Sequence, residues 1–163
     1  MPYACPWPRQ SAGDCPVSNL AVDPETITLT VPGIPVAKGR PRISTAGRFP
    51  RAYTPAKTAR YEDLIKIAAF DRMNGRAPFQ GQLTLSVTAY VPIPKSMPKK
   101  RQREAVEGLV HPTTRPDADN YAKAALDGCN GVLFKDDSQV TDLIVRKRYS
   151  DRPRLVITME YGE

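Results

Sequence analysis

Alternation of apolar and polar residues marks the clearest strand candidates along the chain. Residues 26–31 (TITLTV) and 82–91 (QLTLSVTAYV) carry an apolar or β-branched side chain at every second position, which is the period of a strand with one buried face. Residues 139–149 and 154–161 alternate in the same way on either side of the turn-forming sequence SDRP. The pattern therefore predicts two separate strands followed by a C-terminal hairpin.

The longest helix is predicted for residues 56–73. Thr54 suits the N-cap position. Pro55 suits the first helical position, because the backbone N–H that proline lacks would have no hydrogen-bond partner within the helix there. Apolar residues then recur at helical spacing until Gly75 ends the segment. The preceding residues 32–53 are rich in Pro, Gly and Arg, so we expect a loop without regular structure there.

Two further helices complete a mixed set of elements. Residues 117–130 begin with aspartates and stop before Gly131, and residues 99–107 predict a short, mostly polar helix. We therefore expect one α+β domain at residues 25–163, with a mainly antiparallel sheet packed against helices. Residues 1–24 are rich in Pro and show no period, which predicts an irregular N-terminal extension.

The overall charge points to a polyanionic partner. The chain has 163 residues and a formal charge of +7 at pH 7, which favours nucleic acid as a partner. It has no run of about 18 apolar residues, so no membrane-spanning helix is expected. The N-terminus lacks a signal-peptide pattern, and three cysteines do not suggest a disulfide framework. We expect a cytoplasmic protein that binds nucleic acid and no membrane.

An acidic window contrasts with this basic background. Residues 117–142 contain six aspartates, no glutamate and two lysines, a net charge of −4, so the rest of the chain carries +11. On a helix that begins near the start of the window, Asp119, Lys123 and Asp127 are spaced i, i+4 and i+8 and share one face. The six aspartates are Asp117, Asp119, Asp127, Asp136, Asp137 and Asp142.

Crowded carboxylates favour a divalent cation between them. Without one they repel each other, which raises their pKa values and destabilises the fold. Mg²⁺ usually takes one or two carboxylates together with phosphate oxygens of the substrate, and such a site can activate water for phosphodiester hydrolysis. Lys123 can add positive charge at the transition state. The candidate metal ligands are Asp117, Asp119, Asp137 and Asp136.

Structural explanations for the same residues remain open. Asp117 and Asp119 suit a helix N-terminus, where one carboxylate can cap the free N–H groups. Lys123 is also placed for an ion pair with Asp119 or Asp127. Asp127 lies about 12 Å from Asp119 along the helix axis, so we expect a supporting or structural role for it. Asp136 is either a ligand or a supporting residue, because the side chains of adjacent loop residues point apart.

The acidic window lies within motifs that resemble the RusA family of Holliday junction resolvases, which is common in phages and prophages. The motifs are RPDADNYAK at 115–123, LD at 126–127, DDSQV at 136–140, KGRPR at 38–42 and YTPAKT at 53–58. The resemblance spans about residues 31–159 and implies a RusA-like endonuclease domain that forms a homodimer with Mg²⁺ at each active site. It places the essential carboxylates on Asp117, Asp119 and Asp137, and the catalytically important lysine on Lys123.

One residue within these motifs departs from the family pattern. Tyr121 stands where the family more often has an aliphatic residue, so the helix either packs differently or offers an aromatic ring to DNA. We expect packing. Residues 1–24 match nothing in the family.

A basic segment precedes and enters the first predicted helix. It carries seven positive charges within residues 38–60, with Phe49 and Tyr53 interleaved, which favours phosphate binding. The alternative is a solvated surface loop. A second basic run, from Lys95 to Arg103, either extends the DNA track or forms an exposed face. The candidate DNA-binding residues are Lys38, Arg40, Arg42, Arg48, Arg51 and Lys57.

The sequence and the resemblance together predict a crossover junction endodeoxyribonuclease. It would resolve four-way junctions in branched DNA by Mg²⁺-dependent hydrolysis, in DNA recombination and repair. The two-fold symmetry of a four-way junction independently favours a homodimer, because two matched nicks require two symmetry-related sites. The alternatives are a protein that binds branched DNA without catalysis, and a metal-dependent nuclease that acts on other DNA or RNA structures.

Overall fold

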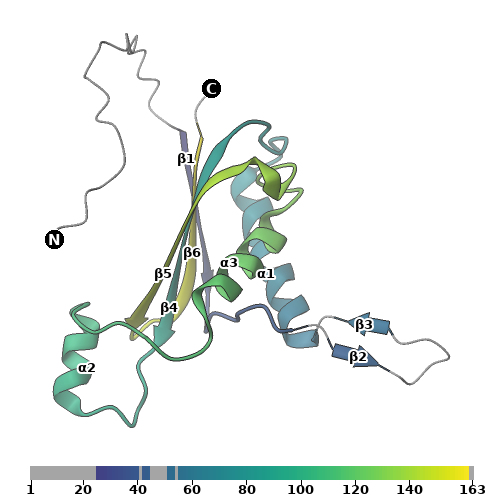
Figure 1. Ribbon diagram of the computed structural model, residues 1–163. Coiled ribbons are helices and arrows are strands. Elements are labelled where there is room, and N and C mark those ends of the chain that lie inside the picture. Colours follow the sequence, from purple (N-terminus) through teal and green to yellow (C-terminus); the bar gives the residue numbers. More distant parts are fainter. Residues whose placement is uncertain (1–24, 41, 45–50, 54, 162–163) are drawn as a thin grey trace, which may run out of the picture.

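A computed structural model describes residues 25–40, 42–44, 51–53 and 55–161, and Figure 1 shows the arrangement of its elements. The mixture of strands and helices confirms the predicted α+β class. The predicted N-terminal extension, residues 1–24, lies outside the described residues. The strands are β1 (Glu25–Pro32), β2 (Arg42–Ser44), β3 (Arg51–Tyr53), β4 (Leu83–Pro92), β5 (Val140–Ser150) and β6 (Arg154–Tyr161). The helices are α1 (Ala56–Met73), α2 (Lys99–Val106), α3 (Ala118–Cys129) and the 3-10 helix η1 (Asp137–Gln139).

Four strands form the main sheet in the order β1-β6-β4-β5. β6 pairs antiparallel with β1 and β4, whereas β4 and β5 are parallel, so the sheet is mostly antiparallel as predicted. The predicted C-terminal hairpin is wrong, because β4 lies between β5 and β6. Alternation specifies which face of a strand is buried and leaves its neighbour unspecified. The long connection through α2 and α3 allows β5 to join β4 in parallel.

Helices α1 and α3 cover the same face of this sheet (Figure 1). Leu85 and Val87 of β4 and Ile157 of β6 point toward the helices and are fully buried. The intervening residues of β4, such as Thr84 and Ser86, are only partly buried, because alternate side chains point to opposite faces. The sheet therefore has one apolar face against the helices and one polar face.

Smaller elements lie outside this core. α2 confirms the short polar helix predicted for residues 99–107. β2 and β3 form an antiparallel hairpin that extends away from the sheet in Figure 1. The prediction of a loop without regular structure at residues 32–53 is therefore wrong for these two strands, because segments of three residues are too short to show a period. Within the described part of the chain, no helix is both long enough and apolar enough to cross a membrane.

α3 approaches α1 very closely at Gly128. A Cβ atom added to Gly128 would lie 2.7 Å from both Cβ and Cγ2 of Ile65, and 3.2 Å from Glu62 O. These distances are shorter than van der Waals contact allows, so only glycine fits at this crossing. The rest of the buried face of α3 is also made largely of small residues, including Ala122, Ala124 and Ala125. The position of α3, and of its N-terminus, follows from this contact.

Replacing Gly128 with Ala should lower the free energy of unfolding by about 1–3 kcal/mol, because the added methyl group overpacks the contact with Ile65. This loss is expected even though Ala favours a helix over Gly by about 1 kcal/mol. Urea denaturation would measure it. In an Ile65→Ala background the same substitution should cost less, and an unchanged cost there would contradict the assigned contact.

Candidate active site

Helix α3 presents one charged face to solvent. Its other face is buried, and Tyr121 is only 1% exposed, which confirms that this tyrosine packs inside the protein. Asp119, Lys123 and Asp127 are exposed at the i, i+4 and i+8 positions that the sequence predicts. The helix matches the predicted segment to within one residue at each end.

The carboxylates at the N-terminus of α3 are open to solvent. Asp117 occupies the N-cap position, yet its side chain makes no capping hydrogen bond. Asp119 lies in the first turn and accepts a hydrogen bond from Lys123 Nζ at 3.1 Å, with side-chain exposures of 61% and 59%. The ion pair considered for Lys123 is thus present. An exposed ion pair of this kind contributes at most about 1 kcal/mol to stability. Either side chain can therefore leave the pair and bind another partner.

Asp136 and Asp137 lie beyond the turn that follows α3. The Asp136 carboxylate accepts a hydrogen bond from Ser138 N, and the Gln139 side chain accepts one from Asp136 N, both at 2.9 Å. These bonds form a capping box at the start of η1. The hydrogen bonds from Ser138 lower the pKa of Asp136. Asp136 therefore has a structural partner, whereas Asp137 is exposed in the first turn of η1.

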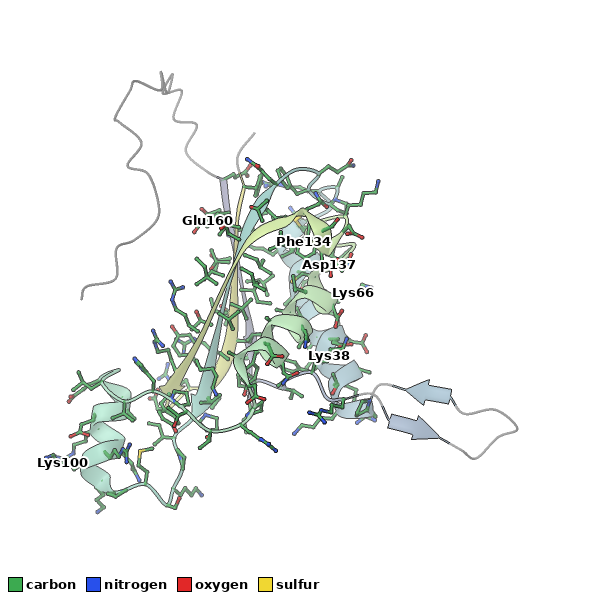
Figure 2. All side chains as sticks on the ribbon, in the orientation of Figure 1. Lys38, Lys66, Lys100, Phe134, Asp137 and Glu160 are labelled. Atoms are coloured by element: carbon green, nitrogen blue, oxygen red, sulfur yellow. The ribbon has the colours of Figure 1, made fainter. Side chains whose placement is uncertain are left out.

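The structure does not bring these carboxylates together within one chain. Asp117 and Asp119 lie at the N-terminus of α3, whereas Asp137, labelled in Figure 2, follows its C-terminus. A helix of 12 residues is about 18 Å long, so the two groups of carboxylates lie at its opposite ends. Within the described residues, no group of three His, Cys, Asp or Glu side chains is placed to hold a metal ion.

Asp117 and Asp119 alone fit part of a magnesium site. Both offer short oxygen donors at an exposed position, and Mg²⁺ commonly takes one or two carboxylates with water and phosphate oxygens in the remaining positions. The N–H groups at the start of α3, which no side chain caps, suit a phosphate oxygen. Asp137, the third expected ligand, is too far away to join them in the same chain.

The loop that leads into this site is held by Lys147 of β5, which sequence reasoning missed. Its Nζ donates hydrogen bonds to Thr114 O at 2.7 Å and to Pro116 O at 2.9 Å. The alternation of β5 could have identified Lys147. It falls on the same face of the strand as Leu143, where an apolar residue is expected. A lysine at such a position indicates a nearby partner, which here is the backbone of the loop.

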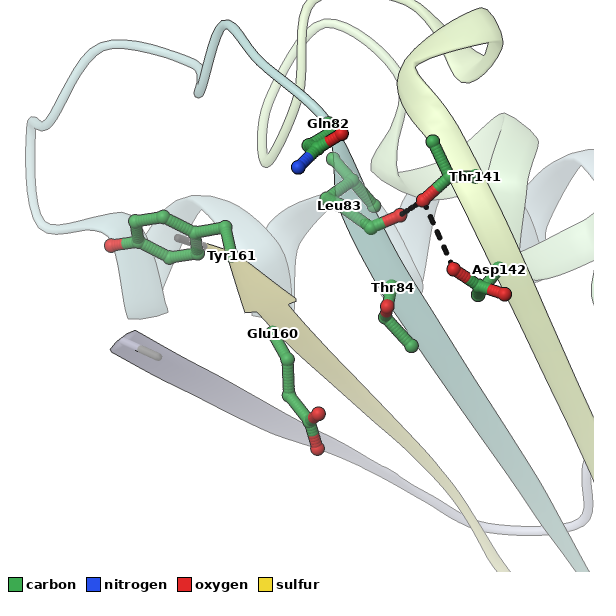
Figure 3. Close-up of a pocket in the computed structure, with 7 residues that line it drawn as sticks. All are labelled: Gln82, Leu83, Thr84, Thr141, Asp142, Glu160 and Tyr161. Atoms are coloured by element: carbon green, nitrogen blue, oxygen red, sulfur yellow. Dashed lines mark hydrogen bonds between the residues drawn. The ribbon is translucent and has the colours of Figure 1, made fainter. Parts of the chain in front are cut away.

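A separate hollow lies on the polar face of the sheet. It has a volume of about 400 Å³ and is lined by residues that include Thr84, Asp142 and Glu160 (Figure 3). Asp142 and Glu160 lie on the two strands that flank Thr84. Because the sheet separates the polar face from α3, this hollow is not part of the candidate site.

Comparisons with known proteins match nearly the whole described chain. A family profile described as Endodeoxyribonuclease RusA matches residues 32–160. The uncharacterized protein YqaN of Bacillus subtilis (strain 168) is 39% identical over 135 residues, which cover 82% of this chain and 94% of YqaN. This chain belongs to the RusA endodeoxyribonuclease family. The match confirms the resemblance found in the sequence, and it spans both ends of the candidate site.

Among the described residues expected to bind DNA in this RusA family member, several precede or begin α1. Arg40 and Lys57 are exposed there. Arg42 and Arg51 belong to the hairpin of β2 and β3, and Arg48 lies outside the described residues. Contact between these residues and DNA stays a prediction.

Lys38, by contrast, already has protein partners. Its Nζ forms an ion pair with Asp127 Oδ2 and lies 3.3 Å from Glu62 Oε1, and its backbone N–H donates to Asn120 O at 2.9 Å. Burial alone would lower the pKa of Lys38, but the hydrogen bonds and charges of Asp127 and Glu62 outweigh burial and raise it. These contacts join the loop after β1 to both α1 and α3. They also support the structural role expected for Asp127.

Replacing Lys38 with Met should lower the free energy of unfolding by about 1–2 kcal/mol. The buried Glu62 Oε1, which has no other hydrogen-bond partner among the described residues, would lose its ion pair while the aliphatic packing is kept. Lys57→Met, at an exposed site nearby, should change the same quantity by less than about 0.5 kcal/mol. Chemical denaturation compares the two variants. Equal losses of stability in the two variants would contradict the structural role of Lys38. Lys38 would then be counted with the exposed basic residues expected to bind DNA.

Proposed function

We propose that this protein is a structure-selective endodeoxyribonuclease that cleaves Holliday junctions with Mg²⁺ as its cofactor. We further propose that it acts as a cytoplasmic homodimer in DNA recombination and repair. Membership of the RusA family supports deoxyribonuclease activity. The observation that carries the proposal is the exposed pair Asp117 and Asp119 at the N-terminus of α3, in a chain of net charge +7. A protein that only binds DNA gains nothing from carboxylates placed against phosphates.

The residues around this pair have distinct parts in the proposed reaction. Asp117 and Asp119 would hold the metal, with water and phosphate oxygens in the remaining positions, and a bound ion of this kind activates water and neutralises charge on the phosphate. The free N–H groups of α3 orient a phosphate oxygen. Lys123 lies one turn from Asp119, where its ammonium group can stabilise charge that develops on the phosphate. Lys147 keeps the loop before Asp117 in place.

Positive charge on two sides of α3 supports binding of a branched DNA. The hairpin of β2 and β3 and the basic helix α2 lie on opposite sides of the N-terminus of α3 in Figure 1. DNA arms that leave a junction in different directions would each meet one of these basic elements. If each cation neutralises one phosphate, log affinity should fall with log salt concentration by about 0.9 per contact. The basic residues of α2 are Lys99, Lys100, Arg101 and Arg103.

The test is incubation of the full chain with a synthetic mobile four-way junction, a linear duplex and a hairpin RNA, each with Mg²⁺ or with EDTA. Paired nicks in the junction that require Mg²⁺ are expected, with little cleavage of the other substrates. Junction binding without any cleavage would support the non-catalytic DNA-binding alternative. Comparable cleavage of duplex or RNA would support a less selective nuclease.

Replacing Asp119 with Asn should reduce junction cleavage at least about 100-fold, the scale of loss when an electrostatic stabiliser of a transition state is removed. Junction binding should persist, because the substitution removes a negative charge and no phosphate donor. Cleavage assays and mobility shifts on one junction measure the two effects. Asp71→Asn, an exposed position on α1, serves as the matched control and should cleave normally. Loss of binding together with cleavage in Asp119→Asn would argue against the metal role.

A further inference from the structure

A pocket lies beside the loop that leads into α3. It has a volume of about 340 Å³, within the range of about 300–1,000 Å³ that is typical of ligand pockets. Its walls come from the loop after β1, the start of α1, the end of β4 and the loop before α3. Pro116, one of the residues that line it, directly precedes Asp117. The pocket therefore adjoins the exposed carboxylates at the N-terminus of α3.

The buried walls of this pocket are mostly apolar. Pro35, Pro112 and Tyr121 are buried, and Val91, near the end of β4, is partly buried against the core. Proline restricts its own backbone, so the two buried prolines help the pocket keep its shape without a ligand. Apolar walls with a few polar groups are typical of sites that bind a small ring system.

Positive charge surrounds this apolar space. Lys57 and Arg115 are exposed beside it, and Lys147 lines it as well. Lys147 uses two of its three N–H donors on backbone carbonyls of the loop before α3. No carboxylate is among the described residues that line this pocket, whereas the hollow in Figure 3 contains Asp142 and Glu160. The pocket therefore suits a group that combines a flat ring with negative charge.

Tyr121 adds a polar group to the wall. The residue is only 1% exposed, and its hydroxyl forms no hydrogen bond with the described residues. Buried tyrosine hydroxyls usually have a partner. Burial raises the pKa of this hydroxyl, so it keeps its proton and can donate a hydrogen bond. A ligand in the pocket can supply the acceptor.

We propose that this pocket receives one nucleobase that has left the stack of a DNA strand, while a phosphate of the same strand lies at the N-terminus of α3. The inference rests on the proposed function, and it adds a specificity site beside the metal. The base packs against the prolines and Val91 and accepts a hydrogen bond from Tyr121. Lys57 and Arg115 meet the phosphates that flank the base.

Base capture gives the protein a physical reason to prefer branched DNA. Removing a base from the stack costs least where the base is already unpaired or its pairing is disturbed. A branch point offers such bases, whereas every base of a linear duplex is stacked and paired. The pocket is therefore filled at little cost only where the DNA is interrupted.

The first test measures binding in EDTA, where no cleavage occurs, to three duplexes that differ at one position. One is fully paired, one has a single unpaired adenine, and one has an unpaired nucleotide that lacks its base. The unpaired adenine should increase affinity about 10-fold over the paired duplex, the scale of one stacked base. The nucleotide without a base should lose most of this gain. Equal affinity for the two interrupted duplexes would overturn the proposal.

The second test places 2-aminopurine, whose fluorescence rises when it leaves the stack, at each branch-point nucleotide of a four-way junction in turn. Binding of the unmodified chain should raise the signal at one position. Val91→Phe fills the pocket and should abolish the rise, whereas Ile67→Phe, at an isoleucine of α1 that is 58% exposed, serves as the matched control and should preserve it. A rise that persists in a folded Val91→Phe variant, or no rise in the unmodified complex, would contradict base capture.

Tyr121→Phe tests the pocket without filling it, because the substitution removes only the hydroxyl. The preference for the unpaired adenine over the nucleotide without a base should shrink several-fold, because one hydrogen bond to the base is lost. The urea midpoint should stay close to that of the unmodified chain, since no described residue bonds this hydroxyl. A lower midpoint with an unchanged preference would assign Tyr121 a structural role only and refute its contact with the base.

Failure of this inference and failure of the proposed function give different results. A chain that cuts junctions with Mg²⁺ but shows no fluorescence rise at any branch-point nucleotide would keep the nuclease function and lose the base pocket. A chain that captures the base but cuts no junction would keep the pocket and lose the nuclease function. Absence of any junction binding would overturn both.

Discussion

The close contact between α3 and α1 is the constraint on which the candidate site depends. Gly128 leaves no space for a Cβ atom beside Ile65, so α3 approaches α1 this closely only because the residue there is glycine. Lys38 links the same two helices through Glu62 and Asp127, and it does so from a loop that begins where β1 ends. The N-terminus of α3 is thereby fixed relative to the sheet. Since catalytic groups tolerate only small displacements, the contact at Gly128 and the ion pairs of Lys38 would hold Asp117 in place for the proposed reaction.

Solvent exposure divides the lysines near α3 into two classes. The Lys38 side chain is 28% exposed and lies between two carboxylates, whereas the Lys123 side chain is 59% exposed and holds one carboxylate. Water and salt screen an exposed ion pair much more than a partly buried one. Lys38 is therefore suited to hold the structure together. Lys123 can give up its ion pair with Asp119 at little cost, which the role proposed for it beside a phosphate would require.

Sequence reasoning was most reliable where one period extended over many residues. The alternation in β4 and the extents of α1 and α3 were predicted nearly to the residue, because each depends on local chemistry. The pairing of β5 with β4 was not predicted, because the choice of a neighbouring strand depends on the whole connection through α2 and α3. The aspartates at the N-terminus of α3 were identified from their spacing. The predicted length of α3 already separated them from Asp137, but the course of the chain after the helix, which decides whether Asp137 returns to them, was not predictable.

The position of Asp137 limits how much of the proposed metal site one copy of the described chain supplies at the N-terminus of α3. Asp117 and Asp119 lie there, whereas Asp137 follows the C-terminus of the helix. Two carboxylates with water and phosphate oxygens are a common ligand set for Mg²⁺. An ion bound at the N-terminus of α3 would therefore take most of its remaining coordination from water and from the phosphate itself, so that metal and substrate would be bound together.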